Sequence, residues 1–139
     1  MARLGIQEAF ARYGAKLRNI QWSVSAWAPD GSLVVSLWAH HYRAGPSGSA
    51  EYADSFDRWG GPGNSEFREN VEKAFAEGRQ VRLVVASTLE TEHVQSGRDA
   101  GKVKKDFDPK VELVGKVAEV NGNQYVIRFS RKKGAVPAP

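Results

Sequence analysis

The sequence predicts a single α+β domain: an antiparallel, curved or partly barrel-like sheet of about five or more strands, with two helices packed on it. Three observations predict this class. Apolar residues alternate over 19–28 and 33–41, on either side of a Pro-Asp-Gly-Ser turn. Residues 65–77 instead carry an apolar stripe at helical spacing. Finally, an Asn-Gly turn at 121–123 joins two further alternating stretches, which is a strong signal of a β-hairpin.

The first half of the chain is expected to contain a helix and a hairpin. Residues 3–14 place apolar side chains on one helical stripe, and Gly14 ends it. Strands at 19–28 and 33–41 then follow, joined by the turn at 29–32. One face of this hairpin is expected to combine small and aromatic residues, which either pack under another element or line a pocket: Ser23, Ser25, Trp27, Trp38 and His40.

The second half is expected to alternate ordered elements with long connections. Residues 42–57 lose periodicity and are interpreted as a loop, with a short strand or turn near its end. The helix over 65–77 would be capped by Asn64 or Ser65 and ended by Gly78. A strand at 80–87, apolar on both faces, is expected at the centre of the sheet.

The remaining residues are expected to close the domain. Residues 88–109 form a second long polar connection, and residues 111–120 and 124–130 form the last hairpin. The domain is expected to span 1–133, with a disordered tail or linker at 134–139.

Composition limits the classes of function. The 139 residues carry a formal net charge of +4, which mildly favours anionic partners. The chain has no cysteine, which excludes disulfides, thiolate catalysis and cysteine-ligated zinc, and fits a cytoplasmic protein. No apolar run approaches the ~20 residues of a membrane span, so we expect no membrane partner. Four tryptophans are a heavy load for the core of a small domain.

Motifs of known catalytic sites are missing from the sequence. There is no phosphate-binding P-loop, no Gly-x-Ser-x-Gly elbow and no His-Glu-x-x-His pair. His40 and His41 are adjacent, so on a strand they would point to opposite faces and could not share a metal. We therefore expect no catalytic residue, no metal and no cofactor. A small enzyme using carboxylates in the hairpin pocket remains the alternative.

The stretch Arg58–Phe67 is the strongest candidate for a binding element. It combines Trp59, the glycine- and proline-rich residues 60–64 and the start of the following helix. Such a loop offers backbone N–H groups, the positive end of a helix dipole and an aromatic face in one place. That combination suits an anionic or planar ligand such as nucleic acid, although a rigid connector with Trp59 at the edge of the core explains it equally well.

Nucleic-acid binding requires cations for phosphates and aromatic or polar groups for bases. Three aromatic side chains are candidates for stacking on a base: Trp38, Tyr52 and Trp59. The candidate phosphate contacts lie on expected loops or element ends: Arg43, Arg58, Arg68, Lys102, Lys104, Lys105, Lys110, Arg131, Lys132 and Lys133. Gly61, Gly63 and Asn64 complete the predicted site within the Trp59 loop.

The segment from Trp59 to Ala74 resembles part of a known family. It contains Trp-Gly, then glycine, proline and asparagine, then Phe67, Asn70 and Ala74. The order around it is similar too, with Asp30-Gly31 and the strand ending at Trp38 before it and a valine-rich strand after it. This pattern, over about 90 residues, resembles the N-terminal modified-DNA-binding domain of McrA-type restriction endonucleases.

The resemblance implies a reader of methylated or hydroxymethylated cytosine in duplex DNA. In that family a separate HNH domain cuts the DNA, and this sequence contains no HNH motif, so nuclease activity is not implied here. The leading hypothesis is thus a DNA-binding domain without catalysis, linked to restriction-modification. The alternative is a protein-interaction module, such as a phage or mobile-element inhibitor of a defence complex.

Overall fold

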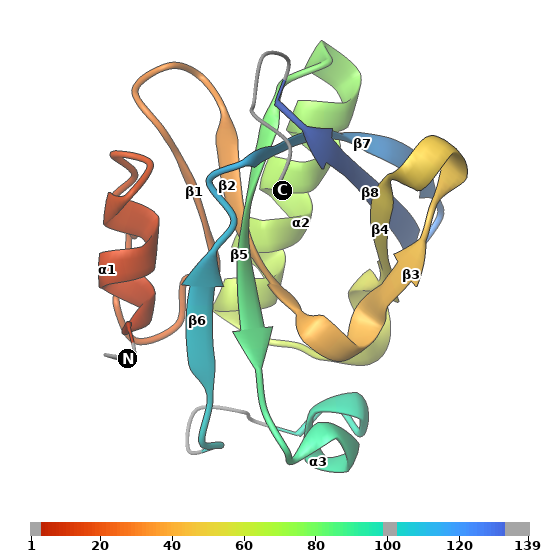
Figure 1. Ribbon diagram of the computed structural model, residues 1–139. Coiled ribbons are helices and arrows are strands. Elements are labelled where there is room, and N and C mark those ends of the chain that lie inside the picture. The colour runs from red at the N-terminus through yellow and green to blue at the C-terminus, as the bar shows by residue number, and fades with distance from the viewer. Residues whose placement is uncertain (1–3, 99–102, 133–139) are drawn as a thin grey trace.

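The computed structural model describes residues 4–98 and 103–132 of the chain (Figure 1). In these residues, eight strands form one sheet in the order β1-β2-β5-β7-β8-β4-β3, with β6 also paired to β5. The helices are α1 (Ile6–Ala11), α2 (Pro62–Glu77) and α3 (Thr91–Gln95), with short 3-10 turns η1 (Ala39–His41), η2 (Pro46–Gly48) and η3 (Phe56–Arg58). The strands are β1 (Ser25–Trp27), β2 (Leu33–Trp38), β3 (Tyr42–Ala44), β4 (Ala50–Ser55), β5 (Val81–Ser87), β6 (Asp106–Pro109), β7 (Leu113–Asn121) and β8 (Gln124–Arg131).

The α+β class is confirmed, and the sheet is mostly antiparallel. One parallel pair, β2 with β5, is the exception, and α2 lies in the connection between its two strands. Strand β5 is central, as its two apolar faces predicted, since it pairs with β2, β6 and β7. The carboxyl ends of β2 and β5 therefore lie side by side at one edge of the sheet (Figure 1).

Two apolar cores lie on opposite faces of β2 and β5. Helix α2 buries its stripe, Phe67, Val71 and Ala74, on the face formed by alternate residues of β2, β5 and β8. Helix α1 packs Phe10 on the other face, against Val34 and residues of β1 and β5. Figure 1 shows α1 and α2 on the two sides of this pair of strands. Successive side chains of β2 thus point alternately towards α2 and towards α1.

The sheet curves because its second half bends away from β5. Strand β6 pairs with the end of β5, whereas β7 meets β5 at a single residue and then pairs along β8. A register shift between Val117 and Glu119 adds to the bend. Gly115 lies at the junction, where a Cβ atom would come within 2.3 Å of the Arg128 carbonyl oxygen. The result is a curved, open sheet with β1 and β3 at its two ends in the sheet order.

Both long connections expected from the sequence contain helices or strands within their described residues. Residues 42–57 contain β3 and β4, and β4 pairs with β8 over six residues. All three residues of β3 are exposed, so this edge strand has no apolar alternation to reveal it. Residues 88–109 contain α3 and β6. The short strand expected near the end of the first connection is confirmed as β4, whereas β3 and β6 were missed because they show little apolar alternation.

The first hairpin also differs from its prediction. Residues 19–24 turn instead of extending β1, because the Asn19 side chain accepts a hydrogen bond from the Gln21 backbone and its carbonyl oxygen accepts another from Ser23. The pairing of Ser25 with Val35 and of Trp27 with Leu33 places those two residues on the α2 face. Asn70 of α2 fixes them there, accepting from Trp27 Nε1 at 3.0 Å and donating to Ser25 Oγ at 2.9 Å. The prediction that Ser25 and Trp27 share a face with Trp38 was therefore wrong.

Candidate nucleic-acid interface

A cleft of about 900 Å³ opens where β2 and β5 end. Its wall combines the last residues of β2 and β5, the turn before β1, the segment from Arg58 to Gly63 and residues in and after α3. Ligands of sheets with parallel strands commonly bind outside the carboxyl ends of those strands, because the connecting loops there are free to vary. The position of this cleft therefore makes it the leading candidate site.

Three of the four tryptophans line this cleft. They come from separate parts of the chain: Trp22 from the turn before β1, Trp38 from the end of β2, and Trp59 from the loop before α2. Each is half-buried, as is Trp27 on the α2 face. The aromatic load that the sequence could not place is thus spread along one cavity, where flat side chains can contact a planar ligand.

The loop that carries Trp59 has a fixed shape. Gly61 has φ 101, which strains any residue with a Cβ atom, and Pro62 occupies the first turn of α2. The helix therefore begins three residues before its predicted start, and Gly61 stands at the N-cap instead of Asn64 or Ser65. Asn64 instead donates from Nδ2 to the carbonyl oxygens of Phe56 at 2.7 Å and Trp59 at 2.6 Å.

Gly63 sets how closely α2 approaches the turn before β1. A Cβ atom at this position would lie 2.3 Å from the Trp22 carbonyl oxygen and 3.5 Å from the Trp59 ring. Gly97, with φ 81, plays the corresponding role after α3, since a Cβ atom there would lie 2.1 Å from the Arg58 carbonyl oxygen. Two glycines thus allow the walls of the cleft to meet.

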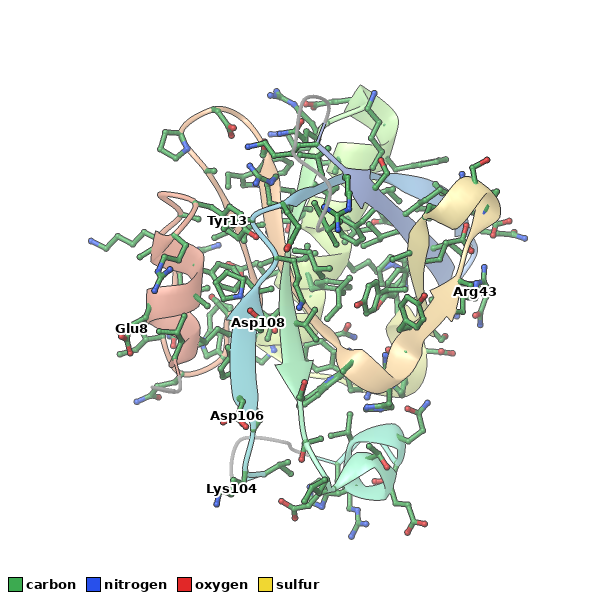
Figure 2. The ribbon with its side chains drawn as sticks, viewed as in Figure 1. Glu8, Tyr13, Arg43, Lys104, Asp106 and Asp108 are labelled. Atoms are coloured by element: carbon green, nitrogen blue, oxygen red, sulfur yellow. The ribbon has the colours of Figure 1, made fainter. Side chains whose placement is uncertain are left out.

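Positive side chains lie along the same cleft. Arg58, Arg98 and Lys105 line it, and exposed Lys104 precedes Lys105 (Figure 2). The only acidic residue among the described lining is Asp54, which is paired with Arg58. The charge of the lining is therefore net positive, which suits an anionic ligand.

A network of polar side chains forms part of the cleft lining. Asp54 Oδ2 accepts from Arg58 Nε at 2.7 Å, and His41 Nδ1 lies 3.6 Å from the same oxygen. His41 Nε2 contacts Gln95 Oε1 at 2.8 Å, which ties η1 to α3. Beside this network, burial and the Asp54 carboxylate raise the pKa of Tyr125.

The histidine pair has another geometry than the one expected. His40 and His41 lie in η1 and not on a strand, and their rings meet edge to face with centroids 4.4 Å apart. Partial burial, followed by the neighbouring His41, lowers the pKa of His40. Residues 4–98 and 103–132 contain no group of three His, Cys, Asp or Glu side chains that could hold a metal.

Comparison with protein-family models, curated proteins and solved structures finds no match. The resemblance to the McrA-type domain therefore stays a prediction from the residues. No helix within the described parts of the chain has the length and apolar character needed to cross a bilayer.

The structure brings together six of the residues predicted for the site. The residues that line the cleft are Trp38, Arg58, Trp59, Gly61, Gly63 and Lys105. Asn64 does not line the cleft but stabilises the Trp59 loop through its two hydrogen bonds to backbone carbonyl oxygens. Lys104 does not line the cleft but directly precedes Lys105, which does. Lys102 and Lys133 lie outside the described residues.

Other predicted contacts lie elsewhere. Arg43 is on β3, paired with Glu51 at 2.9 Å, well away from Lys104 in Figure 2. Arg68 lies over the Phe56 ring and contacts Glu72 and Asn123. Tyr52 is buried and packs edge to face on Phe129, so the prediction that it stacks on a base was wrong. The remaining cations are also outside the cleft lining: Lys110, ion-paired with Asp108, and exposed Arg131 and Lys132.

Sequence reasoning missed several residues of the cleft. They are Trp22, His41, Asp54, Arg98 and Tyr125. Trp22 had been placed on a strand, and Asp54 in a short strand or turn, but neither was predicted to be part of the site. The spacing of Asp54 and Arg58, four residues apart with opposite charges, was the one local signal of their pairing. Tyr125 belongs to an alternating strand and carries no mark that separates it from ordinary core aromatics.

Proposed function

We propose that this protein binds duplex DNA through the cleft at the ends of β2 and β5, without catalysis of its own. The observation that carries the proposal is the gathering of Trp22, Trp38 and Trp59 in one net-positive cavity. Aromatic faces stack on bases of any kind, and cations hold the phosphates beside them. A volume of about 900 Å³ is ample for a base together with its sugar.

The resemblance to the McrA-type domain supports a narrower ligand, methylated or hydroxymethylated cytosine. A 5-methyl group is small and apolar, so a protein distinguishes it by close apolar or aromatic contact. The tryptophans of the cleft offer such contact. A cysteine-free chain with a DNA ligand fits the cytoplasm of a cell that restricts foreign DNA.

Gel-shift titration tests this function directly. The probes are duplexes with and without 5-methylcytosine, at two salt concentrations. We expect Trp38→Ala and Trp59→Ala each to weaken binding about tenfold or more, since stacking on a base contributes about 1–3 kcal/mol. Tyr42→Ala, which removes an exposed aromatic on β3 outside the cleft lining, serves as the control and should bind normally. No binding to either duplex at low salt contradicts the proposal.

A second candidate, a protein-interaction module, is favoured by two exposed apolar side chains. Ile20 at the cleft is 62% exposed, and Leu89, between β5 and α3, is fully exposed. Exposed apolar groups beside aromatic residues are typical of protein interfaces. Retention of a protein partner after nuclease treatment, lost in Trp38→Ala and Trp59→Ala, would favour this candidate over DNA binding.

A further inference from the structure

Three polar side chains with little exposed surface lie next to one another in the lining of the cleft. Asp54 on β4 and Tyr125 on β8 are direct partners in the antiparallel pairing, so their side chains project from the same face as neighbours. Arg58 follows in η3 and reaches back to Asp54. The side chains of Asp54 and Arg58 are only 7% and 10% exposed, and Tyr125 is 5% exposed. All three line the cleft.

Each of these side chains keeps one polar group without a partner among the described residues. Asp54 is engaged through Oδ2 only, which leaves Oδ1 as an acceptor. Arg58 donates from Nε to Asp54 and from Nη1 to the Val94 carbonyl oxygen at 2.8 Å, which leaves Nη2 as a donor. No hydrogen bond of the Tyr125 hydroxyl is found among the described residues. All three residues line the cleft, so these groups can form hydrogen bonds with a ligand that enters it.

The chemistry of the three groups fixes which partner they suit. The Asp54 carboxylate, held by Arg58, can only accept hydrogen bonds, whereas the guanidinium can only donate. Burial and the nearby carboxylate raise the pKa of Tyr125, so its hydroxyl stays protonated and able to donate. The site therefore presents an acceptor beside donors. The complementary ligand has a donor beside an acceptor. Cytosine and adenine have such an edge, because their amino group donates and the adjacent ring nitrogen accepts.

We propose that Asp54, Arg58 and Tyr125 read the amino-bearing edge of a nucleobase, cytosine or adenine, that enters the cleft between the tryptophans. Asp54 accepts from the exocyclic amino group and is the residue that determines specificity. Arg58 and Tyr125 donate to the ring nitrogen or the adjoining carbonyl oxygen. Thymine and uracil place a carbonyl oxygen where the amino group would be, which sets two acceptors against each other. This inference rests on the proposed function and names the ligand edge for that same cleft.

The test uses the full chain and two duplexes that differ by one group. One carries 5-methylcytosine, and the other carries 5-methyl-2-pyrimidinone, which lacks only the 4-amino group. Tryptophan fluorescence reports binding, since three tryptophans line the cleft. We expect the protein to prefer the amino-bearing duplex about tenfold or more. Free cytidine and uridine form a second pair of probes, which separates a base in DNA from a free nucleoside.

Two variants and one control locate the effect. Asp54→Asn keeps the shape and an oxygen for Arg58 but can present an amide N–H to the ligand, so the preference should fall towards unity or reverse. Tyr125→Phe retains the packing on Phe56 and Phe67 and should weaken binding of the amino-bearing duplex severalfold. Asp57→Asn changes an exposed carboxylate that is not part of the cleft lining, and it should keep the full preference. Melting temperatures confirm that each variant is folded.

The outcomes separate this inference from the proposed function. Equal binding of the two duplexes, or an undiminished preference in Asp54→Asn, overturns the inference and leaves DNA binding in place. Binding of cytidine over uridine without binding to any duplex supports the amino-edge site and rejects DNA as its ligand. No binding of any probe rejects both.

Discussion

Asn64 shows how a single side chain can hold a binding loop in shape. Both partners of its Nδ2 are carbonyl oxygens, so only a donor fits at this position. We expect Asn64→Ala to lower the free energy of unfolding by about 2 kcal/mol, since two carbonyl groups lose their donor. Urea unfolding measures this change. Ser65→Ala is the control, because Ser65 is exposed and makes only a 3.3 Å contact with Gly61, and it should unfold like the natural protein.

The Asn64→Ala variant is also expected to disturb the position of Trp59, which a change in tryptophan fluorescence would report. Without the bond to its carbonyl oxygen, Trp59 loses one anchor of its place in the cleft. DNA affinity should therefore fall along with stability. Unchanged stability in Asn64→Ala would mean that Gly61 and Pro62 alone determine the loop shape.

Alanine substitutions at Gly63 and Gly60 are expected to have different effects on stability. Gly63 faces the Trp22 carbonyl oxygen, and a Cβ atom at 2.3 Å from backbone forces α2 and the turn before β1 apart. We expect Gly63→Ala to cost about 1–3 kcal/mol of stability and to change tryptophan fluorescence. At Gly60 a Cβ atom meets nothing within 4 Å, so Gly60→Ala should stay within about 0.5 kcal/mol of the natural protein. Equal effects from the two variants would contradict the close approach.

At the scale of elements, the sequence correctly predicted the helix and the strand whose apolar residues are regularly spaced. The stripe on α2 and the two apolar faces of β5 follow from spacing alone, and both were placed correctly. Strands β3 and β6 contain no buried residue, so their own apolar pattern does not reveal them. Strand β3 is held by pairing with the next strand, β4, and β6 by pairing with the more distant β5. The register of the first hairpin failed for a similar reason, because hydrogen bonds to Asn19 turn the chain where the alternation continues.

The candidate site was predictable only in part for the same physical reason. Trp59 and its glycines form a local motif, and the sequence identified them. Asp54 and Tyr125 come together through the pairing of β4 with β8, two strands whose contact depends on the whole sheet. Chemistry that depends on long-range pairing is invisible until the topology is known.

The β3–β4–β8 side of the sheet carries a charge cluster that predicts a pH effect. Arg128 and Arg43 donate hydrogen bonds to Glu51 and hold its pKa below the ordinary value of 4.5. The carboxylate form is therefore favoured by folding. Its contribution to stability is present above pH 4.5 and is lost as the pH falls through the lowered pKa.

Glu51→Gln tests this dependence. The variant lacks the stabilisation from the Glu51 carboxylate, so it should be less stable than the natural protein at pH 7. The difference in stability between the two proteins, here called the gap, should shrink as the pH falls towards 3. Urea midpoints across this range measure the gap. Glu119→Gln, an exposed change on β7, provides the control and should leave the curve unaltered. A gap of the same size at both ends of the range would show that Glu51 acts by packing and not by charge.

Over the whole molecule, the cations predicted to contact phosphates lie on different parts of the fold. Lys104 and Lys105 directly precede β6, and Lys105 lines the cleft. Arg43 lies on β3, far from Lys104 in Figure 2. If DNA binds at the cleft, these lysines contribute to counterion release from the phosphates, whereas Arg43 does not. Each phosphate contact contributes about 0.9 to the slope of log affinity against log salt.

The salt slope therefore identifies the binding face without knowledge of the preferred base. We expect the double variant Lys104→Ala, Lys105→Ala to bind DNA more weakly and to reduce the magnitude of the slope by about 1–2. Arg43→Ala should leave both affinity and slope unchanged, although it removes a charge of the same sign. Titrations at four or so salt concentrations give the slopes. Should Arg43→Ala reduce the slope while the lysine variant does not, the DNA lies on the β3–β4 side, and the three tryptophans of the cleft serve some other ligand.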